Sequence, residues 1–283
     1  MPRSSDTYRK PGILDRAVQR MGFRAYRNVY WSWYQPRNFG DWITPFLFEA
    51  ITGEQPIFCS PRAQKNLHCV YGAGSILRKI RFPDRVTVWG SGVISGNDEF
   101  ARPAKVLAVR GPYSAERLLK LGYTSTETFG DPAILLPRYY HPVARMVPGR
   151  IGVIPHFRDV AAWDTELPEG MILIDVCQPV DMVVEAIASC EMTIASSLHG
   201  MIVSQAYGRQ SLWIAARIPL EGDDIKFRDY LEAGGVLGAA PATIEVCCGL
   251  SEIESAVRAA TQPDIASLIP ALEQTCPFST IGG

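Results

Sequence analysis

Residues 192–208 read MTIASSLHGMIVSQAYG, and this stretch carries the clearest fold signal in the chain. A β-forming run over residues 192–195 stops at two serines, and apolar residues then recur at helical spacing up to Gly208. The pattern predicts a strand, a tight turn and a helix. In an open parallel sheet such a turn lies at the carboxyl end of a strand, where ligands bind beside the free amide groups of the new helix.

His199 falls in the first turn of this predicted helix, and Ser196 and Ser197 can cap it. The positive end of a helix favours a bound anion and a neutral imidazole. We therefore interpret the turn as a site for a phosphate or carboxylate. The alternative is that both serines are only caps and that His199 only packs.

The same alternation of strand and helix surrounds this unit, which predicts a parallel, right-handed sheet in the second half of the chain. His156 and Arg158 follow its first strand directly and should lie at the same sheet edge as His199. The predicted strands are 151–155, 171–175, 192–195 and 211–215, and the predicted helices are 180–189, 198–207, 223–233, 251–260 and 264–274.

The first half repeats the pattern, with predicted strands at 29–34, 68–71, 86–89 and 106–109 and helices at 42–51 and 112–121. Polar or glycine residues follow the first three strands, where a backbone or an amide can approach a ligand; they are Asn38, Asp41, Gly72, Gly74 and Gly90. Asn38 and Asp41 can equally be turn and cap residues. The third glycine and the acidic partner of a dinucleotide fingerprint are missing, which argues against nicotinamide or flavin binding.

Two charged residues end the first half. Arg110 follows the strand 106–109 directly, where its fork of donors can hold a carboxylate or phosphate in two bonds; a salt bridge between loop and helix is the alternative. Asp131 lies in a turn before an apolar run, so it is either an acid or base at the site or a helix cap.

Three prolines between residues 137 and 150 mark the predicted domain boundary. We predict an α/β chain of two doubly wound Rossmann-like domains, at 29–140 and 150–283, that face a cleft. Residues 1–28 form a basic amphipathic segment with a helix predicted over 14–29. That helix either packs on the body with a solvated arginine face or rests on an anionic membrane surface.

Composition narrows the class of protein. The net charge of −1 over 283 residues argues against nucleic acid as the main partner. Seven cysteines without metal-ligand spacing are typical of reduced thiols in a cytoplasmic protein, and we expect no metal. The sequence has neither a signal peptide nor an apolar span of ~20 residues.

The order of short motifs resembles the polysaccharide pyruvyltransferase family. The motifs are Asn-x-Gly-Asp, Gly-x-Gly-Ser, Trp-Gly-Ser-Gly, Arg-Gly-Pro-x-Ser, Gly-Asp-Pro-Ala, Ile-Pro-His and Ser-Ser-Leu-His-Gly, spread over about residues 29–215. The resemblance implies a shape similar to two-domain glycosyltransferases of the GT-B type. It also implies transfer of the enolpyruvyl unit of phosphoenolpyruvate to two hydroxyls of a sugar in an exopolysaccharide or cell-wall glycan, forming a pyruvate ketal without any cofactor.

In relatives an arginine-leucine-histidine run binds the donor. Leu198 and His199 match it, whereas Ser197 stands in the arginine's place, so Arg158 or Arg110 is expected to supply the missing charge. His199 is assigned to proton transfer or phosphate contact, and Asp131 or His156 to the second acid or base.

Three other interpretations remain open at this point. A GT-B-type nucleotide-sugar glycosyltransferase would bind a diphosphate at the same helix ends. A non-catalytic glycan-binding protein would use the aromatic residues 30–34 as a sugar platform. Peripheral contact with the inner face of a membrane, through the arginine-bearing helix, is compatible with either enzyme because acceptors can be lipid-linked.

Overall fold

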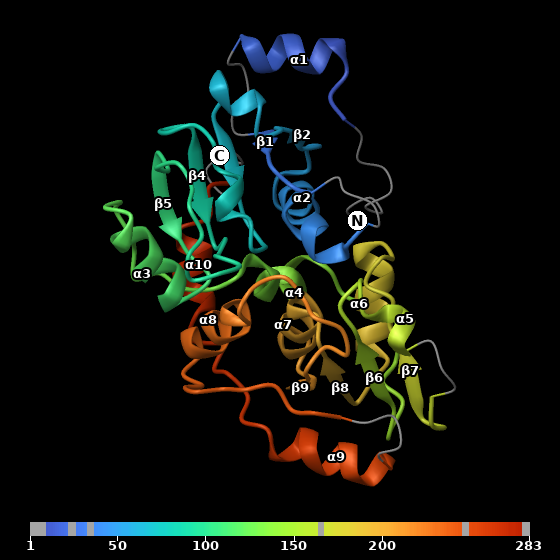
Figure 1. Cartoon of the computed structure of the whole chain (residues 1–283). Coiled ribbons are helices and arrows are strands. Elements are labelled where there is room, and N and C mark those ends of the chain that lie inside the picture. Colours follow the sequence, from blue (N-terminus) through green and yellow to red (C-terminus); the bar gives the residue numbers. More distant parts are fainter. Residues whose placement is uncertain (1–9, 22–26, 33–36, 164–166, 245–248, 279–283) are drawn as a thin grey trace.

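The computed structural model describes residues 10–21, 27–32, 37–163, 167–244 and 249–278. Two parallel β-sheets lie one above the other with helices around them (Figure 1). A mixed α/β chain with two parallel sheets confirms the predicted fold class at that level.

The first sheet has the strand order β2-β1-β3-β4-β5, and every neighbouring pair is parallel. Its strands are β1 (Asn28–Val29), β2 (Ile57–Phe58), β3 (Cys69–Tyr71), β4 (Val86–Trp89) and β5 (Lys105–Ala108). The helices and helical turns of this half are α1 (Ile13–Arg20), α2 (Phe39–Thr52), η3 (Ala63–Lys65), η4 (Leu77–Lys79), α3 (Pro112–Lys120), η5 (Pro132–Leu135) and α4 (Leu136–Tyr139).

The second sheet has the order β7-β6-β8-β9 and is also parallel throughout. Its strands are β6 (Ile151–Ile154), β7 (Met171–Leu173), β8 (Met192–Ala195) and β9 (Gln210–Trp213). The helices of this half are α5 (Val160–Trp163), α6 (Val180–Ala188), α7 (Leu198–Ala206), α8 (Ile225–Ala233), α9 (Leu250–Ala259) and α10 (Ile269–Gln274).

Both sheets reverse their strand order at one point, between β1 and β3 in the first and between β6 and β8 in the second. In open α/β sheets the crevice beside such a reversal, at the carboxyl ends of the strands, is where ligands bind. Each half of the chain therefore offers one such crevice.

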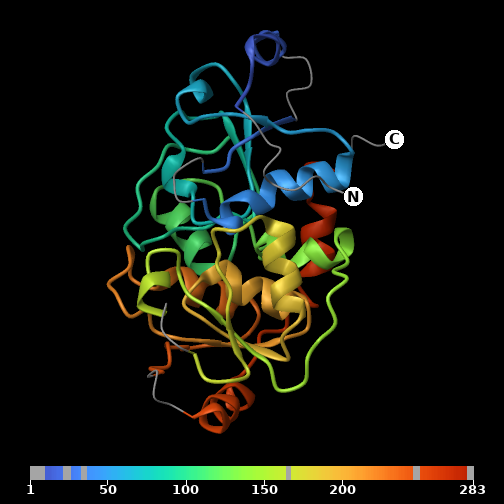
Figure 2. The same ribbon diagram turned by 90° about the vertical axis from the view of Figure 1, so that its right-hand side faces the viewer.

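The two halves share one hydrophobic core. One continuous cluster of buried side chains contains β1 and α2 from the first half and α6 and α7 from the second. The end of the chain also returns to the first half: the Trp89 indole donates to the Leu272 carbonyl at 3.0 Å, and the rings of Phe48 and Phe278 pack edge to face at 5.0 Å. Figure 2 shows α2 in the middle of the molecule, between the two sheets.

The N-terminal prediction needs correction. The helix expected over residues 14–29 ends at Arg20, and Asn28–Val29 is strand β1. Gly22, a poor helix former, follows the observed helix end. The strand expected over 29–34 is reduced to its first residue, with residues 33–36 outside the described part. Within the described ranges no helix is long and apolar enough to span a bilayer.

Candidate active site between the two halves

The two crevices open onto one pocket of about 440 Å³. Residues that follow β1, β3, β6 and β8 contribute to its wall, together with the start of α2 and the loop before α8. The described lining residues are Tyr30, Ser32, Asn38, Asp41, Ser75, Ile76, Arg78, Lys79, Ile94, His156, Phe157, Arg158, Ser197, Leu198, His199, Glu221 and Lys226.

The β8–α7 turn delivers His199 to this pocket as the sequence predicts. Ser197 caps α7, because its hydroxyl accepts a hydrogen bond from the Gly200 amide at 3.3 Å. The His199 side chain is 11% exposed, and its Nε2 lies 3.5 Å from Oδ2 of Asp131. Gly40 packs against the imidazole so closely that a Cβ there would overlap the ring. The ring is thus confined between the start of α2 and Asp131.

Asp131 is fully buried behind His199 rather than in the pocket wall. Its carboxylate caps η5 by accepting from the Ala133 amide at 3.0 Å, and it accepts from the Gly74 amide at 3.4 Å. Burial favours the neutral form, but the His199 contact and the Ala133 amide outweigh it and lower the pKa of Asp131. Asp131 is an ionised partner that orients the imidazole.

Asp41 lies on the pocket side of His199, in the first turn of α2, which Asn38 caps through a 2.9 Å bond from the Gly40 amide. Burial raises the pKa of Asp41, against the opposing influence of His199, the Ser32 hydroxyl and Lys79. Two carboxyl groups near one histidine therefore have pKa values shifted in opposite directions. Such a division is typical of an acid paired with an ionised partner.

Four cationic side chains line the pocket, namely Arg78, Lys79, Arg158 and Lys226. Lys226, at the start of α8, is only 7% exposed, and desolvation by burial, with Arg110 nearby, lowers the pKa of its ammonium to about 8. A buried ammonium that lines a cavity is stabilised by an anion bound there.

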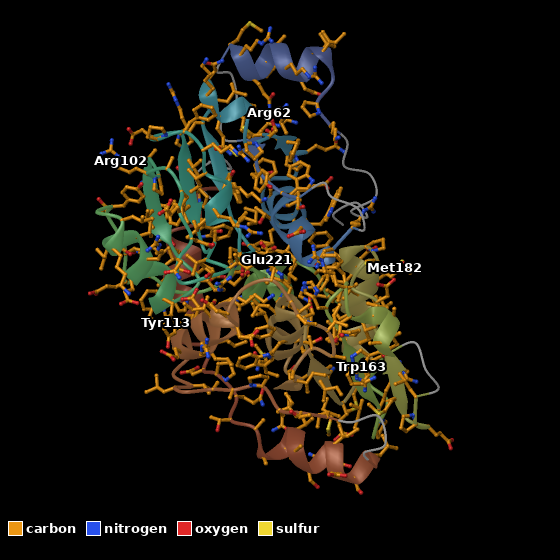
Figure 3. All side chains as sticks on the ribbon, viewed as in Figure 1. Arg62, Arg102, Tyr113, Trp163, Met182 and Glu221 are labelled. Carbon is orange, nitrogen blue, oxygen red and sulfur yellow. The ribbon has the colours of Figure 1, made fainter. Side chains whose placement is uncertain are left out.

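The loop of residues 217–224 crosses from the second half to the first and covers one side of the pocket. Glu221 pairs with Arg78, with Nη2 and Oε2 3.0 Å apart, and Asp223 accepts from the Gly96 amide at 3.0 Å. Figure 3 shows Glu221 between the two halves. Its carboxylate partly offsets the positive charge of Arg78, Lys79, Arg158 and Lys226, which together form the cationic wall of the pocket.

His156 lines the pocket, but its protonation differs from the expectation for an acid or base. Burial, reinforced by Lys226 and Arg158, lowers the pKa of His156 to about 3. The imidazole is therefore neutral at ordinary pH and a weak base. Its backbone amide donates to Ser196 Oγ at 3.0 Å.

Ser196 does not line the pocket and is 1% exposed. Its hydroxyl donates to Asp159 at 3.2 Å, and Asp159 also accepts from the backbone amides of Arg217 and Ile218. Ser196 and Asp159 thus tie the loop that carries His156 to the loop that carries Glu221. Ser196 is a positioning residue, which corrects its expected role as a substrate ligand.

The sequence predicts that Arg110 holds a carboxylate or phosphate of the ligand, and the structure instead places it in a buried ion pair. Its side chain is fully buried and forms an ion pair with Asp229, with Nε 3.0 Å from Oδ2. It also donates to the hydroxyl of Ser75 at 2.6 Å and to the Val93 carbonyl at 2.5 Å. All three guanidinium nitrogens have protein acceptors, so Arg110 joins β5 to α8 and contacts the pocket only through Ser75.

The three predicted glycines approach protein groups and do not line the pocket. Gly72 faces the Thr44 side chain, and Gly90, with a φ of +85°, packs against Pro132. Gly74 has a φ of +112°, and its amide donates to the Asp131 carboxylate. A Cβ added to Gly74 would lie 3.9 Å from the His199 ring. Their effect on the site is indirect, through the packing behind it.

Sequence reasoning missed six polar pocket residues: Ser32, Ser75, Arg78, Lys79, Glu221 and Lys226. For Ser75 the available signal was its place at the end of the Gly-x-Gly-Ser motif. In the alternative sugar platform, Tyr30 lines the pocket but is only 3% exposed, and Trp31 is 1% exposed. Trp33 and Tyr34 lie outside the described residues. No described group of three His, Cys, Asp or Glu side chains is placed to hold a metal ion.

The structure thus shows an α/β chain with a cationic pocket where both sheets reverse their strand order, an arrangement that favours a bound anion. Residues 85–216 match the family model described as polysaccharide pyruvyl transferase, which confirms the resemblance over that part of the chain. They include Arg110, Asp131, His156, Arg158 and His199.

An uncharacterized protein of Acanthamoeba polyphaga mimivirus is similar, at 34% identity over 137 residues. The matched region covers 45% of this chain and 47% of that relative, so it spans about half of each. No solved structure matches the chain. The GT-B-like arrangement and the predicted domain boundaries stay predictions.

Replacing Arg110 with leucine should lower the free energy of unfolding by about 3–5 kcal/mol, because it leaves the buried Asp229 carboxylate without its counter-charge. Chemical denaturation measures the loss. The matched control is Arg102→Leu, which removes the ion pair between Arg102 and Asp84. Because these side chains are 59% and 56% exposed, the loss should be far smaller than that of Arg110→Leu. Equal losses in the two variants would contradict the structural role of Arg110.

Proposed function

We propose that this protein transfers the enolpyruvyl unit of phosphoenolpyruvate to two hydroxyls of a sugar residue in an exopolysaccharide or cell-wall glycan. The observation that carries the proposal is the meeting of four cationic side chains, His199 and Asp41 in one pocket, with the Asp131 carboxylate directly behind the imidazole and its pKa shifted in the opposite direction to that of Asp41. The family match over residues 85–216 supports the class of reaction.

The cationic wall suits the charge of the donor. Phosphoenolpyruvate carries a phosphate and a carboxylate, which need separate cations. Arg158 and Lys226 both line the pocket, and they take over the charge that the arginine of the resembled motif would supply at the position of Ser197. Arg110 is not needed for this, since its donors are already used.

The reaction balances without an oxidant, a reductant or a cofactor. A proton adds to the methylene carbon of the donor, and a sugar hydroxyl attacks the adjacent carbon while losing its own proton. The carbon–oxygen bond to phosphate then breaks, and the second sugar hydroxyl attacks the same carbon to close the cyclic ketal. Of the two hydroxyl protons, one replaces the proton delivered to the methylene carbon and the other leaves with phosphate.

The raised pKa of Asp41 and the contact between His199 and Asp131 support the following proton transfers. Asp41, with a raised pKa, is the proton donor to the methylene carbon. His199, oriented by the ionised Asp131, takes the proton from the attacking hydroxyl. His156 stays neutral and donates or accepts a hydrogen bond at the donor. The cations stabilise the phosphate as it departs.

The direct test is incubation with phosphoenolpyruvate and a glycan acceptor prepared from bacterial exopolysaccharide or cell wall. We expect inorganic phosphate to be released in proportion to ketal-bound pyruvate, detected by mass spectrometry of the glycan. Turnover of a nucleotide sugar without consumption of phosphoenolpyruvate would instead establish the glycosyltransferase alternative. Glycan binding without any turnover would establish the non-catalytic one.

His199→Ala should lower kcat by at least ~100-fold, because the variant loses a proton-transfer group. Phosphate release under saturating donor measures the effect. His141→Ala is the matched control, since His141 is exposed and outside the pocket, and it should retain full activity. Wild-type kcat in His199→Ala would remove His199 from the proposed chemistry.

Donor affinity should fall as the pH rises above about 8. The pKa of Lys226 is lowered to about 8, so the ammonium is charged below this pH and neutral above it. The donor phosphate is already fully ionised there, since its second pKa is near 6. We expect the Kd of phosphoenolpyruvate, measured calorimetrically, to rise about ten-fold from pH 7 to pH 9.

Two variants provide the controls. Lys226→Arg keeps a permanent charge and should remove the pH dependence, because arginine stays protonated in this range. Lys226→Met should bind the donor weakly and equally at both pH values. An unchanged pH dependence in Lys226→Met would show that another group is responsible.

A further inference from the structure

Helix α1 lies apart from the sheets at one end of the molecule (Figure 1). Ile13 is 87% exposed, Leu14 82% and Met21 63%. Large apolar side chains exposed together are unusual on a soluble surface and mark an interaction site.

The angular positions of the side chains around α1 show which side of the helix faces the body. At about 100° per residue, Ile13, Leu14, Ala17 and Met21 occupy one arc of roughly 100°. Gln19 lies roughly opposite the middle of that arc and is the buried residue of α1. Its side chain donates to Asn28 Oδ1 at 3.0 Å and to the Phe58 carbonyl at 3.3 Å. The helix is therefore attached to the body through a polar residue, with its apolar arc pointing outward.

Cationic side chains lie beside this arc. Arg16 and Arg20 are on one flank of it, and together with Lys10 they line a cavity of about 420 Å³ between α1 and the body. None of the described residues that line this cavity is acidic. Residues 1–28 contain seven cationic and two acidic residues, although the whole chain has a net charge of −1. Cationic residues are thus concentrated in the first 28 residues of the sequence.

We propose that α1 docks on an anionic lipid bilayer. The apolar arc enters the boundary between headgroups and acyl chains, and Lys10, Arg16 and Arg20 bind the phosphodiester groups of the lipids. An apolar arc flanked by arginines fits this surface, because apolar burial and attraction to anionic headgroups act on the same helix. A protein partner would have to supply an apolar groove with a negative rim.

The test is flotation of the full chain with vesicles of phosphatidylcholine, alone or mixed with phosphatidylglycerol. We expect binding to the mixed vesicles only, weakened by added salt. Ile13→Ser with Leu14→Ser should lower the partition coefficient at least about ten-fold. Arg16→Gln with Arg20→Gln should lower it about five-fold for each charge removed.

The control is Val143→Ser with Leu237→Ser, which removes two side chains that are 84% and 77% exposed elsewhere, and it should bind like the wild type. The free energy of unfolding checks that each variant folds. Wild-type binding by the Ile13 and Leu14 variant, or equal binding to both vesicle types, would overturn the proposal. So would a dimer in light scattering that this variant dissociates, since a second copy would then cover the arc.

Discussion

A single buried carboxylate holds the candidate site together. Asp131 accepts amide hydrogen bonds from Ala133 and Gly74 and lies 3.5 Å from the imidazole of His199. A carboxylate is expensive to bury unless its oxygens are paired, so these three segments are stabilised in one arrangement. The first sheet, the turn at η5 and helix α7 of the second half meet at this group. The position of the imidazole follows from that meeting.

The described lining of the pocket carries more positive than negative charge. Glu221 and Asp41 are the acidic groups among its described lining residues, against four cations. Lys226 shows the consequence, because burial and the nearby Arg110 lower the pKa of its ammonium to about 8. An anion bound beside it would favour the charged form. In the proposed reaction, donor binding and the protonation of Lys226 are therefore linked.

Hydrophobic periodicity predicted most strands and helices from residue 68 onward, since local pattern and tertiary burial agree there. It missed the short helix α5, and the helix predicted over 264–274 begins only at Ile269. It failed near α1, where the apolar residues face outward and a local pattern cannot show what they contact. Arg110 illustrates a second limit. An arginine at a strand end can hold a ligand or an acid, and its acid, Asp229, is 119 residues away. Arg78, Lys79 and Lys226 reach the pocket through tertiary packing that no spacing reveals.

The shared core has a consequence for movement. Because α2, α6 and α7 belong to one buried cluster and Trp89 is bonded to Leu272, the halves cannot swing apart as independent rigid bodies without exposing apolar surface. Segment 217–224 is different, because none of its residues is buried and it is fastened by polar contacts to Arg78, the Gly96 amide and Asp159. Displacing it would therefore expose less apolar surface than separating the two halves.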